Sequence, residues 1–252
     1  MQNRYTGDIG DYGKYSFLKT LAGSDLRLAV VWYLNPQEEG TADGKFTEYL
    51  SEAKEDWYRP ADPGVYNILK KIVQDDRRRV SSVREERILP VDTIFYEAPL
   101  DYAQFRHAKD RQQARDRWST GAFNDAREAR IVFFDPDNGL GVKSHGPYTK
   151  LGAKYAFEAE IQPFLDRDQS IVVYQHLNRS GTTDDQMRKG IARLSTLAKR
   201  HEAWAISFHA FSVRIYLILA SETDSAIIKE HCEKFVTDPD KQCVFKLRLY
   251  DS

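Results

Sequence analysis

Two short apolar runs in the second half of the chain, residues 130–135 and 170–175, place the strongest constraint on its fold. Both are rich in β-branched and aromatic residues, which predicts strands that are buried on both faces. The segment between them, residues 153–165, has the apolar spacing of a helix. A strand, a helix and a second strand in this order predict a parallel pair joined by a right-handed crossover.

The remaining elements extend this arrangement. Helical spacing recurs in segments 13–22, 64–74, 101–118 and 183–200, and strand-like runs occupy 26–34 and 92–96. Two further apolar runs, 203–209 and 213–220, are separated by a very short turn and must pair antiparallel. The sequence thus predicts an α/β fold, a three-layer α/β/α sandwich with a mostly parallel sheet and a C-terminal antiparallel hairpin.

Length and composition narrow the class of protein. The chain has 252 residues, 41% of them hydrophobic, which suits one α/β domain over residues 1–252. The first residues are polar and no apolar run reaches membrane-spanning length, so we expect a cytoplasmic protein with no membrane partner. Cys232 and Cys243 match no zinc motif, so we expect no metal. The net charge of −1 excludes a wholly basic coat protein but allows a local basic groove.

Polar residues follow strand 130–135 directly. In open α/β sheets the ligand crevice lies beyond the carboxyl ends of the strands. Pro136 cannot extend the ladder, so the carboxylates of Asp135 and Asp137 and the amide of Asn138 converge on this crevice. These are also good turn formers, and a loop without further role is the alternative. We favour a functional site because the cluster follows a buried strand immediately.

Strand 170–175 is followed by polar groups at the same edge of the sheet. His176 could donate to a base carbonyl or act as an acid or a base, and Arg179 could hold a phosphate. A single histidine at a strand end is more often structural. Here the amides of Gln175 and Asn178 flank it, which favours a role in binding and catalysis.

A third polar cluster, segment 7–15, precedes the first predicted helix and contains three glycines, two acids and two tyrosines. Glycines ahead of a helix could turn backbone N–H groups toward an anion, and Tyr12 or Tyr15 could stack on a flat ring. Capping of the helix by Asp8 and Asp11 is the alternative. The density of polar residues favours a binding loop.

Basic residues cluster in three places outside these segments. Residues 101–118 and 77–79 are balanced by acids, which predicts ordinary solvated faces. Lys143, Lys150 and Lys154 follow the acidic strand end without an acid among them. We therefore predict that these three lysines contact the phosphates of a nucleic acid.

The second half of the chain resembles the class I methyltransferase fold in the order of its elements. Residues 135–138 are similar to the Asp-Pro-Pro-Tyr base-binding motif, although they lack its aromatic residue. Residues 7–14 are similar to the N-terminal arm of bacterial 23S rRNA adenine N6-methyltransferases of the J type. The resemblance implies S-adenosylmethionine as cofactor. A methyl-donor site needs a Gly-rich turn after its first strand, but the first glycine after strand 26–34 is Gly40.

The same crevice suits hydrolysis of an N-glycosidic bond, which needs carboxylates, donors for the leaving base and stacking residues, but no cofactor. The chain is broadly similar to the uracil-DNA glycosylase superfamily, with an acidic N-terminal loop at 7–15 and a late histidine loop at 176–181. In size and loop chemistry it also resembles a phage-defence DNA glycosylase that removes glucosylated hydroxymethylcytosine. This resemblance implies modified phage DNA as the partner.

The sequence therefore predicts a DNA glycosylase in anti-phage defence that uses no cofactor. The predicted catalytic residues are Asp8, Asp11, Asp135, Asp137 and His176, and the predicted substrate-binding residues are Tyr12, Lys14, Tyr15, Asn138, Gln175, Asn178 and Arg179. Two alternatives stay open, an S-adenosylmethionine-dependent base methyltransferase and a non-catalytic nucleotide-binding module on the same scaffold. Buried acids are costly unless used, which argues mildly against the non-catalytic module.

Overall fold

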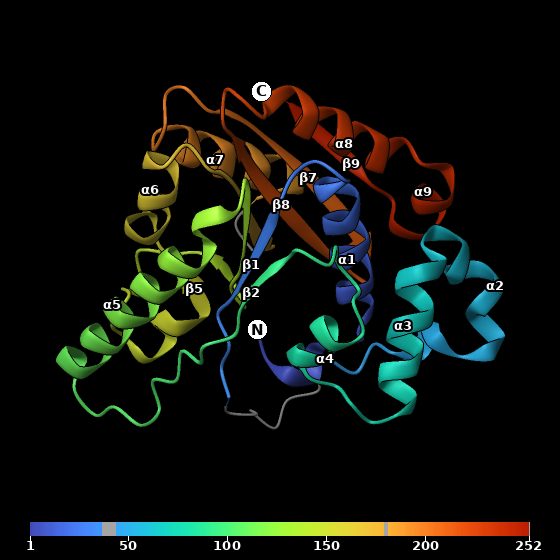
Figure 1. Cartoon of the computed structure of the whole chain (residues 1–252), viewed down its shortest axis with the longest axis horizontal. Coiled ribbons are helices and arrows are strands. Elements are labelled where there is room, and N and C mark those ends of the chain that lie inside the picture. Colours follow the sequence, from blue (N-terminus) through green and yellow to red (C-terminus); the bar gives the residue numbers. More distant parts are fainter. Residues whose placement is uncertain (37–43, 179–180, 252) are drawn as a thin grey trace.

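The computed structural model describes residues 1–36, 44–178 and 181–251 of the chain. In this part of the chain, seven strands form one sheet in the order β2-β1-β3-β6-β8-β7-β9 (Figure 1). These strands are β1 (Leu28–Trp32), β2 (Ile94–Tyr96), β3 (Ile131–Asp135), β6 (Ser170–His176), β7 (Glu202–Ala210), β8 (Ser212–Ala220) and β9 (Arg248–Asp251). Two short strands, β4 (Gly139–Leu140) and β5 (Tyr155–Ala156), form a separate parallel ladder.

The sheet is parallel on one side and antiparallel on the other. Strands β2, β1, β3 and β6 run parallel, and β8 lies between β6 and β7, antiparallel to both. Strand β9 closes the edge antiparallel to β7. Five of these seven strands therefore point the same way, which confirms the predicted mostly parallel sheet and its antiparallel hairpin.

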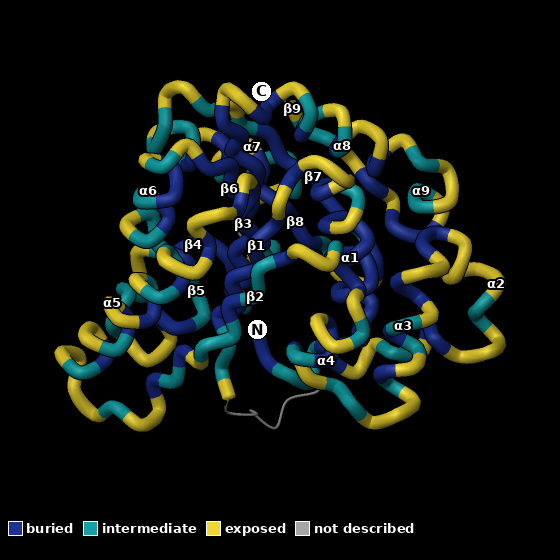
Figure 2. The backbone as a smooth tube through the Cα atoms, in the orientation of Figure 1, coloured by how far each residue is buried: buried dark blue, intermediate teal, exposed yellow. Residues whose placement is uncertain are grey.

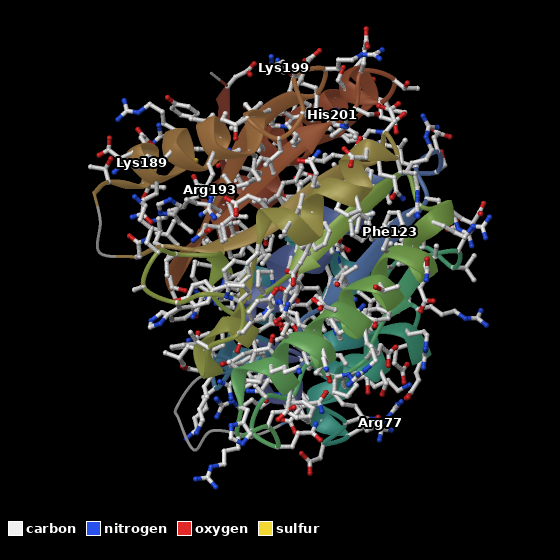
Figure 3. All side chains as sticks on the ribbon, turned by 90° about the vertical axis from the view of Figure 1, so that its left-hand side faces the viewer. Arg77, Phe123, Lys189, Arg193, Lys199 and His201 are labelled. Carbon is white, nitrogen blue, oxygen red and sulfur yellow. The ribbon has the colours of Figure 1, made fainter. Side chains whose placement is uncertain are left out.

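Helices cover both faces of the sheet (Figures 1 and 3). One layer contains α1 (Ile9–Ala22), α3 (Pro63–Gln74), α8 (Ser225–Thr237) and α9 (Pro239–Phe245), with the short helices α2 (Glu55–Tyr58) and α4 (Val80–Glu85) beside them. The other layer contains α5 (Ala108–Asp125), α6 (Glu158–Asp166) and α7 (Thr183–Ser195). Figure 3 looks onto this second layer, where Phe123 marks α5 and Arg193 marks α7. The protein is thus the predicted three-layer α/β/α sandwich. Each helix in the described part of the chain is too short or too polar to cross a bilayer.

The central strand β3 is apolar from Ile131 to Phe134 because both of its faces are covered. Ile131 and Phe133 pack into the core beneath the α1 layer, while Val132 and Phe134 pack into the core beneath the α5 layer. Successive residues of a strand point to opposite faces, so a strand covered on both sides needs apolar residues at every position. Figure 2 shows the backbone of β3 in the colour of buried residues. Asp135 ends the apolar run at the rim of the sheet.

Helix α1 begins earlier than the apolar spacing predicts. Its first residue is Ile9 rather than residue 13, because Asp8 caps the helix by accepting the backbone N–H of Asp11. The interpretation of segment 7–15 as a binding loop is therefore wrong, since most of it forms the first turns of a helix. The capping alternative was right for Asp8, whereas Asp11 lies inside the helix and supplies the N–H.

Helix α5 also differs from its predicted bounds and surroundings. It covers Ala108–Asp125 rather than 101–118. Two of its arginines, Arg111 and Arg115, are buried, so the prediction of an ordinary solvated face is wrong for these two. The other basic residues of segment 101–118 are exposed as predicted, namely Arg106, Lys109 and Arg117. The cause of the burial is tertiary, because α5 packs on the sheet and the two buried arginines donate to backbone carbonyls such as those of Tyr148 and Tyr155.

Candidate functional site

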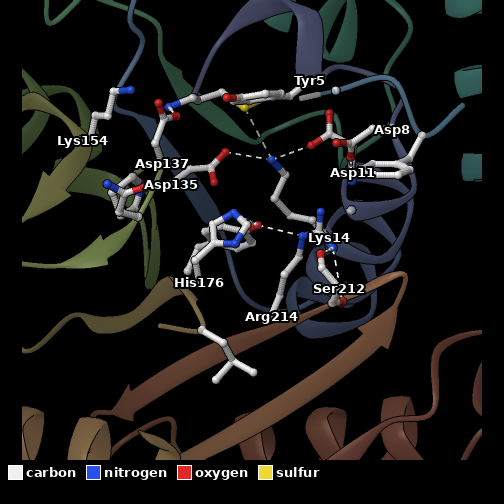
Figure 4. Close-up of a pocket in the computed structure, with 18 residues that line it drawn as sticks. Tyr5, Asp8, Asp11, Lys14, Asp135, Asp137, Lys154, His176, Ser212 and Arg214 are labelled. Atoms are coloured by element: carbon white, nitrogen blue, oxygen red, sulfur yellow. Dashed lines mark hydrogen bonds and ion pairs between the residues drawn. The ribbon is translucent and has the colours of Figure 1, made fainter. Parts of the chain in front are cut away.

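A pocket of about 480 Å³ opens where β3 and β6 end (Figure 4). Its other walls come from the first turns of α1, the start of β8 and the first residues of the chain. The lining residues are Met1, Tyr5, Asp8, Gly10, Asp11, Lys14, Gly44, Phe46, Asp135, Pro136, Asp137, Asn138, Lys154, Tyr174, His176, Leu177, Ser212 and Arg214. The pocket lies at the carboxyl ends of the parallel strands, where α/β sheets bind their ligands.

Local structure explains why acids meet in this pocket. Asp135 pairs in register with Trp32 of β1, and Pro136 follows it and cannot continue the ladder. On α1, Asp11 and Lys14 are three residues apart and therefore share a face of the helix. The N-cap position of Asp8 adds a third carboxylate at the same end of α1.

Lys14 connects the helix to the strand. Its Nζ lies 2.7 Å from Oδ1 of Asp11 and 2.8 Å from Oδ2 of Asp135, so one ammonium group bridges two carboxylates (Figure 4). All three side chains are at least nine-tenths buried. Buried charges are tolerated when they are paired in this way. The bridge fixes the two aspartates side by side at the pocket.

Burial and neighbouring charges shift the proton affinities of this group. Burial raises the pKa of Asp11 from 3.8 to about 6, against the attraction of Lys14 and with the support of Asp8. Burial alone would lower the pKa of Lys14, but Asp11 and Asp135 outweigh it and hold that pKa well above its ordinary value. The lysine therefore stays charged, while Asp11 changes protonation close to neutral pH.

One carboxylate oxygen of Asp11 takes no part in the bridge with Lys14. Its Oδ2 is buried and has no hydrogen-bond partner among the described residues, and the same holds for the hydroxyl of Tyr15. Burial and the Asp11 carboxylate together raise the pKa of Tyr15 well above its ordinary value, so this tyrosine stays protonated. Asp11 is therefore the lining acid with both a tuned pKa and an unfilled acceptor.

A second set of contacts joins the hairpin to the pocket. Arg214 Nε donates to the Tyr174 hydroxyl over 2.8 Å, and that oxygen lies 3.0 Å from Nε2 of His176. His176 pairs with Arg214 across β6 and β8, so the three side chains share one face of the sheet. Arg214 also donates to Ser212 through Nη1.

Sequence reasoning missed Arg214 and Tyr174. The available signal was Arg214 itself, the charged residue within the apolar run 213–220. A charge in a buried strand needs a buried partner, which would have directed attention to a hydroxyl or an acid on the neighbouring strand. Tyr5 and Phe46 were also missed, and both are aromatic residues that line the pocket.

The structure brings together eight of the predicted site residues. These are Asp8, Asp11, Lys14, Asp135, Asp137, Asn138, Lys154 and His176, all of which line the pocket. Asp137 also forms an ion pair with the α-amine of Met1, which donates to the carbonyl of Tyr33 over 2.8 Å.

The predicted stacking role of Tyr12 and Tyr15 does not fit their positions. Both are fully buried. Tyr12 stacks on Tyr49 with ring centroids 5.4 Å apart, and its hydroxyl accepts from the backbone N–H of Asp62. Residues that are adjacent in the sequence of a helix point in different directions. Asp11 and Lys14 therefore face the pocket, while the side chain of Tyr12 points into the core.

Gln175 and Asn178 have structural contacts in place of the predicted substrate contacts. Gln175 accepts the backbone N–H of Leu140 and donates to the carbonyl of Asn138, which holds the turn after β3. Backbone groups of Asn178 bond to Gln186 of α7. Neither lines the pocket, and Arg179 lies outside the described residues.

The three lysines predicted to contact phosphate separate into two groups. Lys154 lines the pocket, while Lys143 and Lys150 are exposed on the segment between β4 and β5. Within the described residues, no three His, Cys, Asp or Glu side chains are arranged to hold a metal ion. The sequence matches no protein-family model and no curated protein.

Proposed function

We propose that this protein hydrolyses the N-glycosidic bond of a modified base in DNA. The observation that carries the proposal is the Lys14 bridge, which holds Asp11 and Asp135 side by side at a pocket. One of these acids has a pKa of about 6 and an unfilled acceptor. A pair of carboxylates in which one has a raised pKa is typical of enzymes that cleave glycosidic bonds.

Asp11 is assigned the role of general base. In its ionised form it accepts a proton from water as the water oxygen attacks the anomeric carbon, and the carbon–nitrogen bond breaks with its electron pair leaving on the base. The carboxylate of Asp135, which is paired with Lys14, stabilises the positive charge that develops on the sugar. His176 donates a hydrogen bond to the departing base, which afterwards takes up a proton from water.

The pocket suits a base that has left the DNA helix. Its volume of about 480 Å³ falls in the range of small-molecule sites. Tyr5 and Phe46 line it and take over the stacking role predicted for Tyr12 and Tyr15. Exposed Lys143 and Lys150 supply positive charge for the flanking phosphates. The phage-defence role stays a prediction from the sequence.

The direct test is to incubate the protein with glucosylated phage DNA and with uracil-containing DNA, followed by alkali. Abasic sites break in alkali, so the proposal expects strand cleavage that depends on protein and on time. Asp11→Asn and His176→Ala should abolish cleavage. Glu160→Gln is the matched control, because Glu160 is a largely buried acid that does not line the pocket. Intact strands on both substrates would contradict the proposal.

The methyltransferase alternative is favoured by one observation. Strand β8 lies between β6 and β7 after an Asp-Pro strand end on β3, which is the element order on which that resemblance rests. However, the end of β1 is covered by Met1, whose carbonyl accepts the backbone N–H of Asn35. Calorimetry with S-adenosylmethionine separates the two proposals, since micromolar binding would favour methyl transfer over hydrolysis.

A further inference from the structure

A second pocket, of about 400 Å³, lies beside the pocket described above. Its walls come from α2, α9 and the tip of the β7–β8 hairpin (Figure 1). Ser212 lines both pockets, so the two cavities are neighbours. A polymer that places one of its units in the first pocket therefore passes close to the second.

Exposed aromatic rings surround the second pocket. Phe46 lines the first pocket and Phe211 lines the second, and their rings stack with centroids 5.5 Å apart. These two residues are 48% and 65% exposed, and Trp57 on the α2 wall is 60% exposed. Large apolar side chains that are exposed together mark binding surfaces. Flat rings in this position suit a ligand that is itself flat.

The turn of the hairpin presents Phe211 in a strained conformation. Strand β7 ends at Ala210 and β8 begins at Ser212, so Phe211 alone lies between them. Its φ of +61° is in the left-handed region, which glycine adopts freely and a bulky residue does not. Strained residues are concentrated at sites that bind ligands. The aromatic ring is thus held at the pocket by a turn that glycine would form more easily.

The two pockets differ in charge. Within the described residues, four aspartates line the first pocket, whereas no Asp or Glu lines the second. The basic side chains of Lys246 and His209 line the second pocket, and Lys246 is exposed. Burial lowers the pKa of His209, and the positive charges of Arg248 and Lys246 lower it further. Aromatic rings combined with positive charge are typical of sites that bind single-stranded nucleic acid.

We propose that the second pocket binds the nucleotide next to the base in the first pocket. The neighbouring base stacks on Trp57 and Phe211, and its phosphate lies near Lys246. This inference rests on the function proposed above, because it takes one DNA strand as the ligand of both pockets. Stacking on aromatic rings is tolerant of the identity of the base, so we expect this pocket to accept each of the four bases.

Tryptophan fluorescence measures occupancy of the second pocket. The chain has four tryptophans, and Trp32, Trp118 and Trp204 are buried, which leaves Trp57 as the exposed one. Titration with an unmodified single-stranded oligothymidylate should quench its emission in a saturable way. The quenching should disappear in Trp57→Phe. Absence of quenching, or equal quenching in Trp57→Phe, would overturn the inference.

Affinity for the same oligonucleotide tests the stacking contact. Phe211→Gly removes the ring from a turn that glycine forms without strain, so the variant should keep its fold. The Kd should rise about tenfold, which is the usual effect of losing one stacked base. Fluorescence anisotropy of a labelled strand measures the Kd. An unchanged Kd in this variant would contradict the stacking role of Phe211.

Salt dependence tests the phosphate contact. Lys246→Ala should lower the slope of log Kd against log salt concentration by about 0.7, the value for one phosphate of a single strand. Lys234→Ala is the matched control, because Lys234 is an exposed lysine of α8 that lines neither pocket. It should leave the slope unchanged. Equal slopes in Lys246→Ala and in the unmodified protein would show that Lys246 does not contact the phosphate.

Hydrolysis separates failure of this inference from failure of the proposed function. On glucosylated DNA, Trp57→Ala should raise KM about tenfold with little change in kcat, because it removes binding that is equal in the ground state and the transition state. Binding at Trp57 without hydrolysis would contradict the proposed function and leave the nucleotide site standing. Hydrolysis with an unchanged KM in Trp57→Ala would overturn this inference alone.

Light scattering tests a second copy of the chain as the occupant of the aromatic surface. The inference expects the same oligomeric state in the unmodified protein and in Trp57→Ala. A dimer that Trp57→Ala converts to a monomer would show that the exposed rings join two copies of the chain, and it would overturn the inference.

Discussion

Two buried ionic clusters lie on opposite faces of the sheet, and they differ in whether their hydrogen bonds are complete. On the α5 side, Arg115 pairs with Glu160 and donates to the carbonyls of Gly152 and Tyr155. Glu160 also accepts from the hydroxyl of Tyr33. On the α1 side, Lys14 bridges two aspartates and still leaves Oδ2 of Asp11 without a partner.

The difference separates a structural ion pair from a candidate site. A buried cluster whose donors and acceptors are all filled holds helices and loops in place and has nothing left to offer a ligand. A cluster with excess carboxylates at a pocket carries an unfilled acceptor and a shifted proton affinity, which is the usual condition of catalytic groups. The following variants test this distinction.

The largest expected effect is on the rate of hydrolysis in Asp11→Asn. The amide cannot accept a proton, so kcat should fall by about 10²–10⁴-fold. Alkali-labile cleavage of the DNA substrate measures the rate, and circular dichroism checks the fold. Glu160→Gln should keep kcat per folded molecule within about twofold. Equal losses in both variants would remove the distinction between the clusters.

The second effect is on the free energy of unfolding, and here the larger loss is expected in the cluster on the α5 side. Glu160→Gln leaves the buried Arg115 without its carboxylate, and the free energy of unfolding should fall by about 3–5 kcal/mol. Urea unfolding measures this change. A value below about 1 kcal/mol would show that the α5-side pair is not the structural element described above.

The third effect is the pH dependence of kcat/KM. A general base must be ionised, and the pKa of Asp11 is raised to about 6. The value of kcat/KM should therefore be constant above this pH and fall about tenfold for each pH unit below it.

The free energy of unfolding should depend on pH in the opposite direction, because the carboxyl group of Asp11 binds its proton more tightly in the native state than in the unfolded chain. The contribution of Asp11 to stability should fall as pH rises from about 4 to about 6, measured against Asp11→Asn. A rate that is flat down to pH 5 would contradict the assignment.

The smallest effect is expected for Tyr15→Phe. The Tyr15 hydroxyl lies close enough to the Asp11 carboxylate to influence its protonation without forming a hydrogen bond of normal geometry, so its removal should raise the pKa of Asp11 slightly. The midpoint of the pH–rate profile should move up by a few tenths of a unit with the plateau rate nearly unchanged. Movement to lower pH would show that Tyr15 does not favour the ionised carboxylate.

Much of the fold was predictable because it depends on neighbours in the sequence. The four residues of β3 that precede Asp135 are all apolar, and this alone requires a strand covered on both faces. The length of the hairpin turn likewise required β7 and β8 to be antiparallel. The start of α1 was misplaced because the cap of Asp8 acts through a single hydrogen bond and gives little periodic signal.

The candidate site was only half predictable, and His176 shows why. Its place after a buried strand could be read from the sequence, but Arg214 reaches its partner Tyr174 across a separation of 40 residues. No local pattern reports a contact of that range. The only local signal was Arg214 itself, a charged residue within the apolar run 213–220.

The sequence by itself determined that Asp135 ends a buried strand at the rim of an α/β sheet, since apolar periodicity and the following proline are local properties. Only the tertiary structure decided that Lys14, 121 residues away, pairs with it, and that Tyr12 on the same helix does not reach the pocket. The physical reason is that the packing of α1 against the sheet selects which helix face meets the strand ends. That choice is made by the whole core rather than by any one segment.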